Sequence, residues 1–242
     1  MKILIVRHAE PDYSVDSLTE CGFKEAEALA EKLSKQEILD IYSSPCGRAL
    51  RTAEATASKL NMNINVLDWL TEFQGKIVVD ESHKSIPWNL EPRFWSEKKK
   101  LYDINSWLDE EFILSDDVFE KYNYVVDGFD MLLKKYGYER DGIIYKCDYN
   151  SEQTIVLFCH FALGMVLVSH LTGISPVLLW QSLFLPTSSV TTFVTEERVK
   201  GEVVFKCMQM GDTSHLYKKD INVSKSGLFP EIYGEEGAGP QL

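Results

Sequence analysis

Apolar runs and stretches of helical periodicity alternate along the first third of the chain. Lys2–Val6 is a continuous, β-branched apolar run that ends on polar residues, which predicts a short strand buried on both faces. An amphipathic helix is predicted to follow, with Thr19 as its N-cap and Glu20 in its first turn. The apolar face of this helix is expected to comprise Phe23, Ala26, Ala30 and Leu33.

The same alternation continues beyond this helix. The segment ILDIYSSP predicts a strand that ends near Ser43 and Ser44, Arg48–Leu60 predicts a second helix, and INVLDWL a third strand. Strands that alternate with helices are typical of a parallel sheet with crossover helices. In such sheets, ligands bind at the carboxyl ends of the strands.

The alternation stops between residues 76 and 153, where the sequence is aromatic-rich and mostly helical in pattern. It resumes at TIVLFCH, which predicts a buried strand ending at His160; a helix up to Gly173 and strands near Ser189–Thr195 and Val203–Gln209 follow. We therefore predict an α/β fold: a three-layer α/β/α sandwich with a mostly parallel central sheet. Residues 1–75 and 154–242 would form the core. Residues 76–153 would be a largely helical insertion, a cap or specificity region over the carboxyl ends of the strands.

Composition narrows the choice of partners and compartment. The chain has 25 Lys and Arg against 37 Asp and Glu, and its net charge of −12 disfavours a nucleic-acid partner. Its five cysteines are scattered without a CxxC pair, which predicts reduced thiols and a cytoplasmic location. No apolar stretch reaches the roughly 18 residues of a membrane span, so no membrane association is expected. A homodimer is left open.

Polar side chains follow four of the predicted core segments. Arg7 and His8 follow the first strand, Arg48 lies just beyond the second, Glu72 follows the third, and His160 ends a later one. A single strand-end histidine is weak evidence of function. Four such segments on one predicted sheet edge are stronger evidence, because they bring these residues to one place.

Five segments resemble, in order, the motifs of the histidine phosphatase superfamily, also called phosphoglycerate mutase-like. They are LIVRHAEP, LTECGFKEAEALAEKL, YSSPCGRALRTAEATA, WLTEF and VLFCHFALG. The resemblance covers roughly residues 1–75 and 154–216, with GDTSHL as the closing segment.

The resemblance implies a role for each matching residue. His8 would be the nucleophile that takes the phosphoryl group, Arg7 and Arg48 would hold the phosphate oxygens, His160 would complete the pocket, and Glu72 would be the proton donor. This set suits phosphoryl transfer, which needs forked cationic donors around the phosphate and an in-line nucleophile. The implied activity is hydrolysis of a small phosphorylated metabolite, without metal or cofactor.

The chain departs from the family pattern at two places. The family more often has Gly, Thr and Asn where Ala9, Pro11 and Ser14 stand, so Ser14 is expected to replace the amide donor. Phe161 and Ala162 stand where the family commonly has two glycines. Phe161 still offers its backbone N–H to a phosphate.

Three other functions are weighed against the phosphatase. A phosphoglycerate mutase would use the same pocket with a lid that excludes water, but the segment WLTEFQGK resembles the phosphatase branch more closely. A catalytically weak regulatory or binding protein is suggested by the missing glycines. A metal hydrolase built on His8, His160 and Glu72 lacks the usual ligand spacing.

Several further residues have simpler interpretations. His170 is interpreted as a packed or capping residue and Cys159 as part of a buried strand, whereas His215 is left open between a structural and a functional role. The basic run around Arg93 and Lys98–Lys100 is interpreted as solvated. The tail is predicted to be irregular and docked by Leu228, Phe229 and Tyr233.

Overall fold

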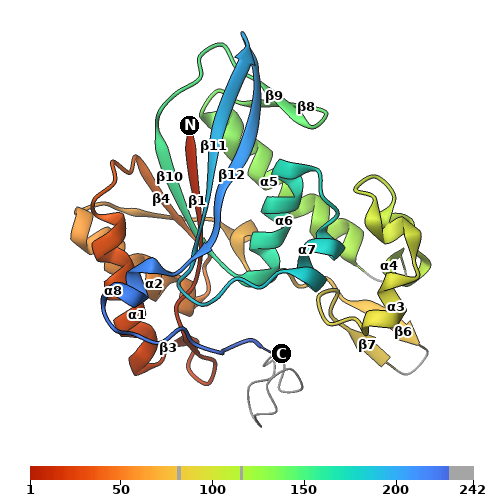
Figure 1. The fold of residues 1–242 in the computed structure, drawn as a ribbon, viewed down its shortest axis with the longest axis horizontal. Helices are drawn as coiled ribbons and strands as arrows, with labels where there is room; N and C mark the ends of the chain where they lie inside the picture. The colour runs from red at the N-terminus through yellow and green to blue at the C-terminus, as the bar shows by residue number, and fades with distance from the viewer. Residues whose placement is uncertain (81–82, 115–116, 229–242) are drawn as a thin grey trace.

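A mixed sheet of eight strands lies at the centre of the computed structural model, which describes residues 1–80, 83–114 and 117–228 (Figure 1). In spatial order the strands are β5 (Ile64–Val66), β4 (Asp40–Ser43), β10 (Thr154–Cys159), β1 (Lys2–Arg7), β11 (Val190–Val199), β12 (Glu202–Asp212), β9 (Ile144–Lys146) and β8 (Glu139–Asp141). The first four of these strands run parallel, and each later neighbour pair is antiparallel. The predicted α/β class with a parallel centre is confirmed.

Helices cover both faces of this sheet (Figure 1). One face carries α1 (Glu20–Leu33), α2 (Gly47–Leu60) and α8 (Ser214–Lys218). The other carries α5 (Val118–Lys135), α6 (Phe161–Thr172) and α7 (Pro176–Ser182). The three predicted layers are therefore present.

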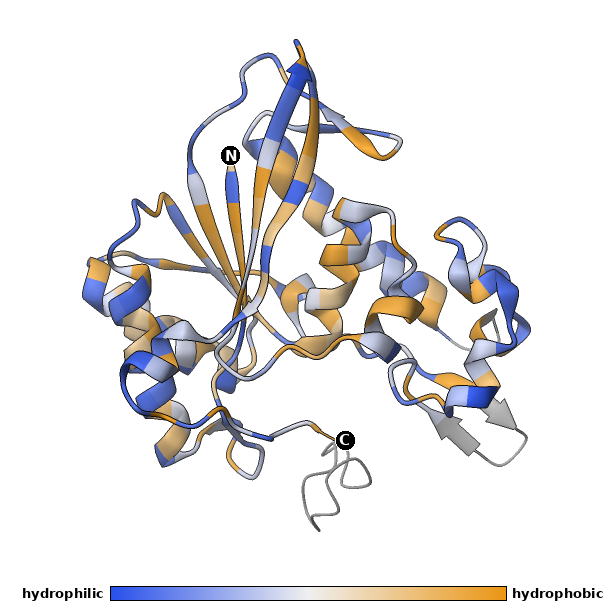
Figure 2. Cartoon of the chain, viewed as in Figure 1, coloured by the Kyte–Doolittle hydropathy of each residue, from blue (hydrophilic) through white to orange (hydrophobic). Residues whose placement is uncertain are grey.

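The side chains of β1 alternate between two hydrophobic cores because successive residues of a strand point to opposite faces. Leu4 and Val6 pack with α1 and α2, whereas Ile3 and Ile5 pack on the α6 side. Figure 2 shows apolar residues along the central strands and α6, and hydrophilic residues on the outer elements. A strand buried on both faces needs a continuous apolar sequence, and β1 and β10 have one.

Helix α1 begins where the sequence predicts, and the Thr19 hydroxyl accepts a hydrogen bond from the Gly22 N–H. The prediction is wrong for Phe23, which is 50% exposed. Glu25 is buried in its place. The third predicted strand is also shorter than expected, since β5 ends at Val66 and the 3₁₀ helix η1 (Asp68–Leu70) follows it.

The segment between residues 76 and 153 divides into two parts. Its first part projects to one side of the molecule (Figure 1) and contains β6 (Ile77–Asp80), β7 (His83–Ser85), α3 (Pro92–Ser96), η2 (Lys99–Tyr102), η3 (Trp107–Asp109) and α4 (Glu111–Leu114). Its second part, α5 with the β8–β9 hairpin, packs on α6 and extends the central sheet. The expectation of a largely helical insertion thus missed two short hairpins, β6–β7 and β8–β9.

Aromatic side chains form the core of the projecting part, as expected for an insertion of this size. Trp107 is fully buried, and its ring lies 5.0 Å from that of Tyr122 and 5.9 Å from that of Trp180, measured between centroids. Trp180 belongs to α7. These contacts attach the projecting part to the helices that cover the sheet.

Candidate active site

The carboxyl ends of three parallel strands meet at one edge of the sheet. Arg7 pairs in register with Cys159, and Phe158 pairs with Ser43, so the next residue of each strand, His8, His160 and Ser44, emerges at the same level. Backbone hydrogen bonds fix this arrangement, since the His8 N–H donates to the Cys159 carbonyl at 2.9 Å and the Ser44 N–H to the Phe158 carbonyl at 2.9 Å. The predicted convergence of strand ends is observed.

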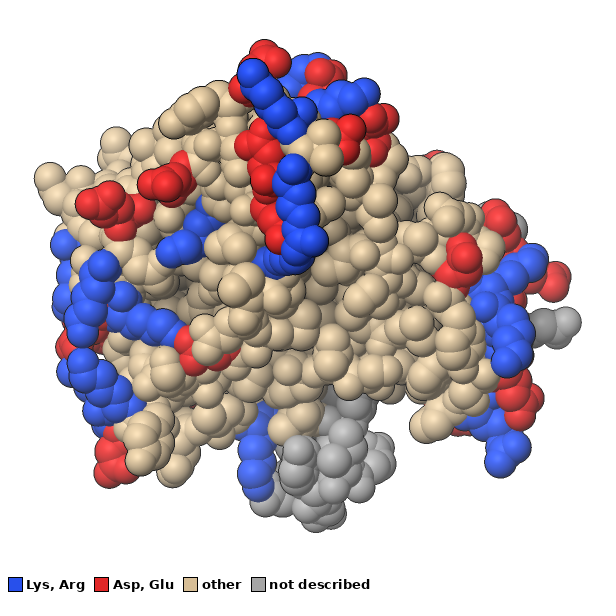
Figure 3. All heavy atoms as spheres, turned by 45° about the horizontal axis from the view of Figure 1, so that its top comes forward, with Lys and Arg blue, Asp and Glu red and all other residues tan. Residues whose placement is uncertain are grey.

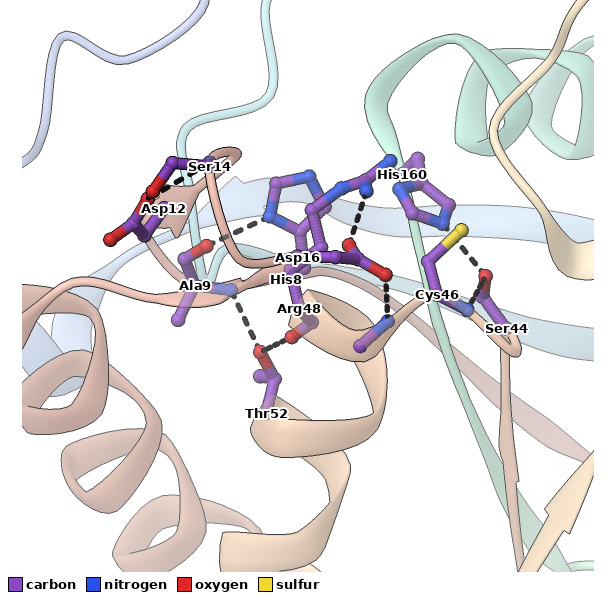
Figure 4. A network of polar contacts seen from close by, with 11 residues as sticks. His8, Ala9, Asp12, Ser14, Asp16, Ser44, Cys46, Arg48, Thr52 and His160 are labelled. Carbon is purple, nitrogen blue, oxygen red and sulfur yellow. Dashed lines mark hydrogen bonds and ion pairs between the residues drawn. The ribbon is translucent and has the colours of Figure 1, made fainter.

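The two histidine rings face one another at this edge (Figure 4). Their centroids are 5.1 Å apart at an interplanar angle of 63°, and the side chains are almost fully buried. Burial, the neighbouring Arg7 and Arg48, and for His160 the nearby His8, hold both imidazole pKa values well below the usual range. Both rings are therefore neutral at pH 7.

Hydrogen bonds orient each ring. His8 Nδ1 lies 2.8 Å from the Ala9 carbonyl oxygen, which can only accept, so Nδ1 carries the proton and Nε2 keeps its lone pair. His160 Nε2 lies 2.8 Å from Ser44 Oγ. His160 Nδ1 is buried and has no partner among the described residues.

The Ala9 backbone is held in turn by helix α2 (Figure 4). Its N–H donates to Thr52 Oγ1 at 3.0 Å, and the Thr52 hydroxyl donates to the Arg48 carbonyl at 2.8 Å. Thr52 is fully buried. The turn that follows His8 is thus tied to the first turn of α2.

Arg7 lies at the end of β1 and is only 4% exposed. Its Nη1 donates to the Leu185 carbonyl at 2.6 Å, and its guanidinium lies over the rings of Phe161 and Phe184, 5.8 and 5.3 Å from their centroids. The Arg7 Nε atom is buried without a partner in the described structure. Phe161 therefore lines the site with its ring.

Arg48 stands in the first turn of α2 and is held by Asp16. Its Nη1 lies 2.8 Å from Asp16 Oδ1, and the Gly47 N–H donates to Asp16 Oδ2 at 2.7 Å (Figure 4). The Tyr13 ring covers the Arg48 guanidinium at 5.4 Å. Asp16 and Tyr13 were missed by the sequence prediction because they lie in a loop without periodicity.

Glu72 follows η1 and faces the start of α6. Its Oε1 accepts the N–H groups of Phe73 at 2.8 Å and Leu163 at 3.0 Å, and its Oε2 accepts that of Ala162 at 3.4 Å. Burial raises the pKa of the Glu72 carboxyl, and this effect outweighs the opposing backbone hydrogen bonds and the positive charges of Arg7 and Arg48. A raised pKa favours the protonated form, which can act as an acid.

Two other residues considered from the sequence, Ser14 and Cys159, do not act together with the two histidines. Ser14 is exposed, and its hydroxyl donates to Asp12 Oδ1 at 2.5 Å, so the structure does not bring it to the histidines as a substitute amide donor (Figure 4). Cys159 is fully buried, and its thiol pKa is raised by burial, so it is not a nucleophile at neutral pH.

Two further histidines, His170 and His215, have structural partners. His170 Nε2 lies 2.9 Å from Asp130 Oδ1, and His215 Nε2 lies 3.0 Å from Ser188 Oγ. Arg93, with an ion pair to Glu97, is an exposed residue of the projecting part, as the interpretation of the basic run as solvated predicts.

The C-terminal segment reaches the site. The Ser226 carbonyl accepts a hydrogen bond from Arg7 Nη2 at 3.4 Å. Gly227 has φ +87°, and a Cβ there would lie 2.7 Å from Arg7 Nη2, so only glycine fits without displacement. The tail is docked through its backbone. Two of the residues predicted to dock it, Phe229 and Tyr233, lie outside the described residues.

Among the described residues, one group of side chains is arranged closely enough to hold a metal ion, and it lies apart from the histidine pair. Within the described residues, the group of three possible ligands whose atoms come within 4.8 Å of one another is Glu10, Cys21 and Glu25. Glu10 and Glu25 already accept hydrogen bonds, from Thr19 Oγ1 and from the Glu10 N–H. No helix in the described part of the chain combines the length and apolar character needed to cross a membrane.

The fold and the strand-end histidines define a class of α/β proteins with an arginine and histidine cluster at the sheet edge. The family model described as the histidine phosphatase superfamily (branch 1) matches residues 3–109. The chain is thus similar to this superfamily over a little less than half of its length.

Two curated relatives match part of the chain. A probable phosphatase of Schizosaccharomyces pombe is 35% identical over 79 residues, which cover 28% of this chain and 28% of that protein. Phosphoserine phosphatase 1 of Hydrogenobacter thermophilus is 33% identical over 81 residues, which cover 30% of this chain and 38% of that protein. The chain thus matches these relatives over less than half of their length.

Solved structures match the fold more completely. A phosphoserine phosphatase of Entamoeba histolytica, in complex with 3-phosphoglyceric acid, has a TM-score of 0.57 and 20% identity over 89% of this chain and 98% of the other. A mycobacterial glucosyl-3-phosphoglycerate phosphatase has a TM-score of 0.56 and 18% identity over 87% and 98% of the two chains. At these identities the comparison supports the fold.

Proposed function

We propose that this protein hydrolyses small phosphomonoesters through a phosphohistidine intermediate on His8. The observation that carries the proposal is the state of the His8 ring. It is buried and neutral, its Nδ1 is bonded to the Ala9 carbonyl, and its Nε2 lone pair is free beside Arg7, Arg48 and His160. A neutral imidazole held in this way attacks phosphorus without losing a proton first.

The two arginines would bind the phosphate group. Guanidinium groups present several N–H donors in a plane and match phosphate oxygens, and their charges offset the negative charge of the transferring group. Arg48 gives one of its donors to Asp16, so it would bind phosphate from a position already fixed by α2. The Phe161 N–H, the first of α6, would add the positive end of a helix, since the next two N–H groups donate to Glu72.

In the first step, a bond forms between His8 Nε2 and phosphorus while the bond from phosphorus to the ester oxygen breaks. Glu72 would give its proton to the departing alkoxide. In the second step, water attacks the phosphoryl group, Glu72 takes a proton from that water, and the bond to His8 breaks. Free phosphate leaves, and both residues return to their starting states.

The proposed substrates are small phosphorylated metabolites. Similar proteins include a phosphoserine phosphatase and a glucosyl-3-phosphoglycerate phosphatase. The projecting part of the chain is the proposed source of selectivity, because it follows Glu72 directly. Phe73 packs against Trp88 and Trp180, with centroids 6.5 and 5.3 Å away, so this segment adjoins the proton donor.

A rapid-quench experiment tests the proposal. Brief exposure to ³²P-labelled substrate followed by alkaline quench should trap one base-stable, acid-labile phosphoryl group per chain, and peptide mapping should locate it at His8. The His8→Ala variant should lose both the label and turnover. The matched control is His170→Gln, since His170 lies at the far end of α6 and should leave labelling unchanged.

A label that persists in His8→Ala, or full turnover by that variant, would refute the phosphohistidine mechanism. Turnover without any trapped label in the wild-type protein, under conditions where the second step is slowed by low temperature, would also count against it.

A further inference from the structure

A second group of cationic side chains lies away from the histidine pair, between α1 and α8. A cavity of about 120 Å³ is lined there by Ala28, Glu31, Ser214, His215 and the four lysines Lys32, Lys35, Lys218 and Lys219. Figure 3 shows basic side chains gathered on the side of the molecule where α1 and α8 lie in Figure 1. Such a cluster is unusual in a chain with a net charge of −12.

Two of the four lysines are already neutralised. Lys32 forms an ion pair with Asp212, and Lys219 forms one with Glu31 at 2.7 Å. Glu31 lines the cavity together with Lys219, whereas Asp212 is not among the lining residues. The other two lysines, Lys35 and Lys218, therefore give the cavity its net positive charge.

Lys35 and Lys218 are exposed lysines of this cavity, and neither forms an ion pair among the described residues, although Glu31 lies near both. The Lys218 ammonium lies close enough to lower the pKa of Lys35, and among the described residues no carboxylate comes within 4.0 Å of either Nζ atom. Two adjacent ammonium groups repel each other. An anion placed between them would remove this repulsion and accept hydrogen bonds from both.

His215 supplies a third polar group. Its side chain is only 3% exposed, its Nε2 is bonded to Ser188 Oγ, and its Nδ1 is buried without a partner in the described part of the chain. A buried polar atom without a partner costs free energy. An oxyanion in the cavity would favour the form of the ring in which Nδ1 carries a proton, because only that form donates.

We propose that this cavity is a second phosphate-binding site, separate from the pocket at His8. Its volume of about 120 Å³ equals that of roughly four water molecules at about 30 Å³ each, which suits one tetrahedral anion. Phosphate has several strongly accepting oxygens and two charges near neutral pH, which match two ammonium groups and a ring nitrogen. The site would take free phosphate or the phosphate group of a small metabolite.

The two sites are close but distinct. Ser188 stands between them, since its Oγ contacts His215 and its N–H donates to the His8 carbonyl at 3.0 Å. No hydrogen bond between described residues joins His215 to His8, His160 or Arg7. Histidine NMR signals can therefore report the two sites separately in one titration of the full chain.

The experiment titrates the ¹⁵N-histidine-labelled protein with inorganic phosphate. Saturable shifts of the His215 signals, assigned with His215→Gln, are expected alongside those of His8 and His160. Lys35→Gln/Lys218→Gln should weaken the His215 response at least about tenfold and leave the His8 and His160 responses unchanged. The control Lys24→Gln/Lys59→Gln removes the same charge, one residue from α1 and one from α2, and should leave all responses intact.

A parallel titration with methylphosphonate separates the two sources of the phosphate group. If the His215 signals respond to both ligands, the cavity accepts a phosphate group that is attached to an organic molecule. If they respond to phosphate alone, the cavity binds only the free ion. No saturable His215 shift with either ligand would overturn the proposal, as would a shift that survives Lys35→Gln/Lys218→Gln.

Discussion

Glu72→Gln separates proton donation from every other contribution of Glu72. The glutamine Oε1 can still accept the N–H groups of Phe73 and Leu163, which lie at 2.8 and 3.0 Å from the glutamate oxygen. The new amide group would face the Ala162 N–H, whose bond to Oε2 is already long at 3.4 Å. We therefore expect a loss of unfolding free energy of no more than about 1 kcal/mol.

The catalytic loss should be larger and should depend on the leaving group. A general acid contributes about 10²–10⁴ in rate, or about 3–5 kcal/mol, when the leaving group is a poorly stabilised alkoxide. A nitrophenolate leaves without a proton. Glu72→Gln should thus slow the first turnover of an alkyl phosphate about 10²–10⁴-fold, and that of p-nitrophenyl phosphate less than about tenfold.

Stopped-flow and rapid-quench measurements of the first turnover are the right assay, because in the proposed mechanism Glu72 would also act as the base of the second step. On p-nitrophenyl phosphate the variant should release one equivalent of nitrophenolate in a burst and then turn over slowly. Urea unfolding in parallel checks the small effect on stability. Equal losses on both substrates in the first turnover would refute the assignment of Glu72 as the acid.

Four further outcomes are expected. Thr52→Val leaves the buried Ala9 N–H without its acceptor, so it should lower the unfolding free energy by about 1–3 kcal/mol and reduce kcat. Thr56→Val is the control, because it removes a buried hydroxyl that has no partner in the described structure. Urea melts should show that Thr56→Val is neutral or stabilising. Burial raises the pKa of Glu25 to about 7, so the folded state binds more protons than the unfolded state between about pH 4.3 and pH 7. The unfolding free energy should therefore fall by about 3–4 kcal/mol as pH rises through that window and then level off. Glu25→Gln should flatten this pH profile. Trp88→Leu should change KM ratios among phosphorylated substrates while kcat on p-nitrophenyl phosphate stays within about threefold; a collapse of kcat on all substrates would mean that the segment supplies a catalytic group. Turnover should survive EDTA, and a loss restored by a divalent ion would contradict the metal-free mechanism.

The central residues of the site were predictable because strands end where apolar runs end. His8 and His160 each follow a run buried on both faces, and parallel strands bring such ends together. The position of Arg48 was predicted from the start of an amphipathic helix. The hydrophobic pattern was therefore enough to predict both the parallel half of the sheet and the four segments that meet at its edge.

Other parts of the site follow from contacts that no periodicity encodes. Asp16 and Ser226 reach the arginines from irregular segments, and glycine is needed at position 227 because its φ is +87° and Arg7 lies against it. Glu25 is buried on α1 where a charged residue is normally solvated, because Thr187 and the Glu10 N–H satisfy it. Contacts with residues distant in the sequence determine whether such side chains are buried.

The register between β1 and β10 also sets when the site can exist during synthesis. Lys2 pairs with Thr154, and His8, the proposed nucleophile directly after β1, meets His160 only after the whole intervening chain has been made. At about 5–20 residues per second, a ribosome would hold His8 without its partner for many seconds. Nascent chains that end before β10 should therefore lack a place for β1 in the sheet and carry no enzymatic activity, and β1 would stay exposed to chaperones until the late strand arrives.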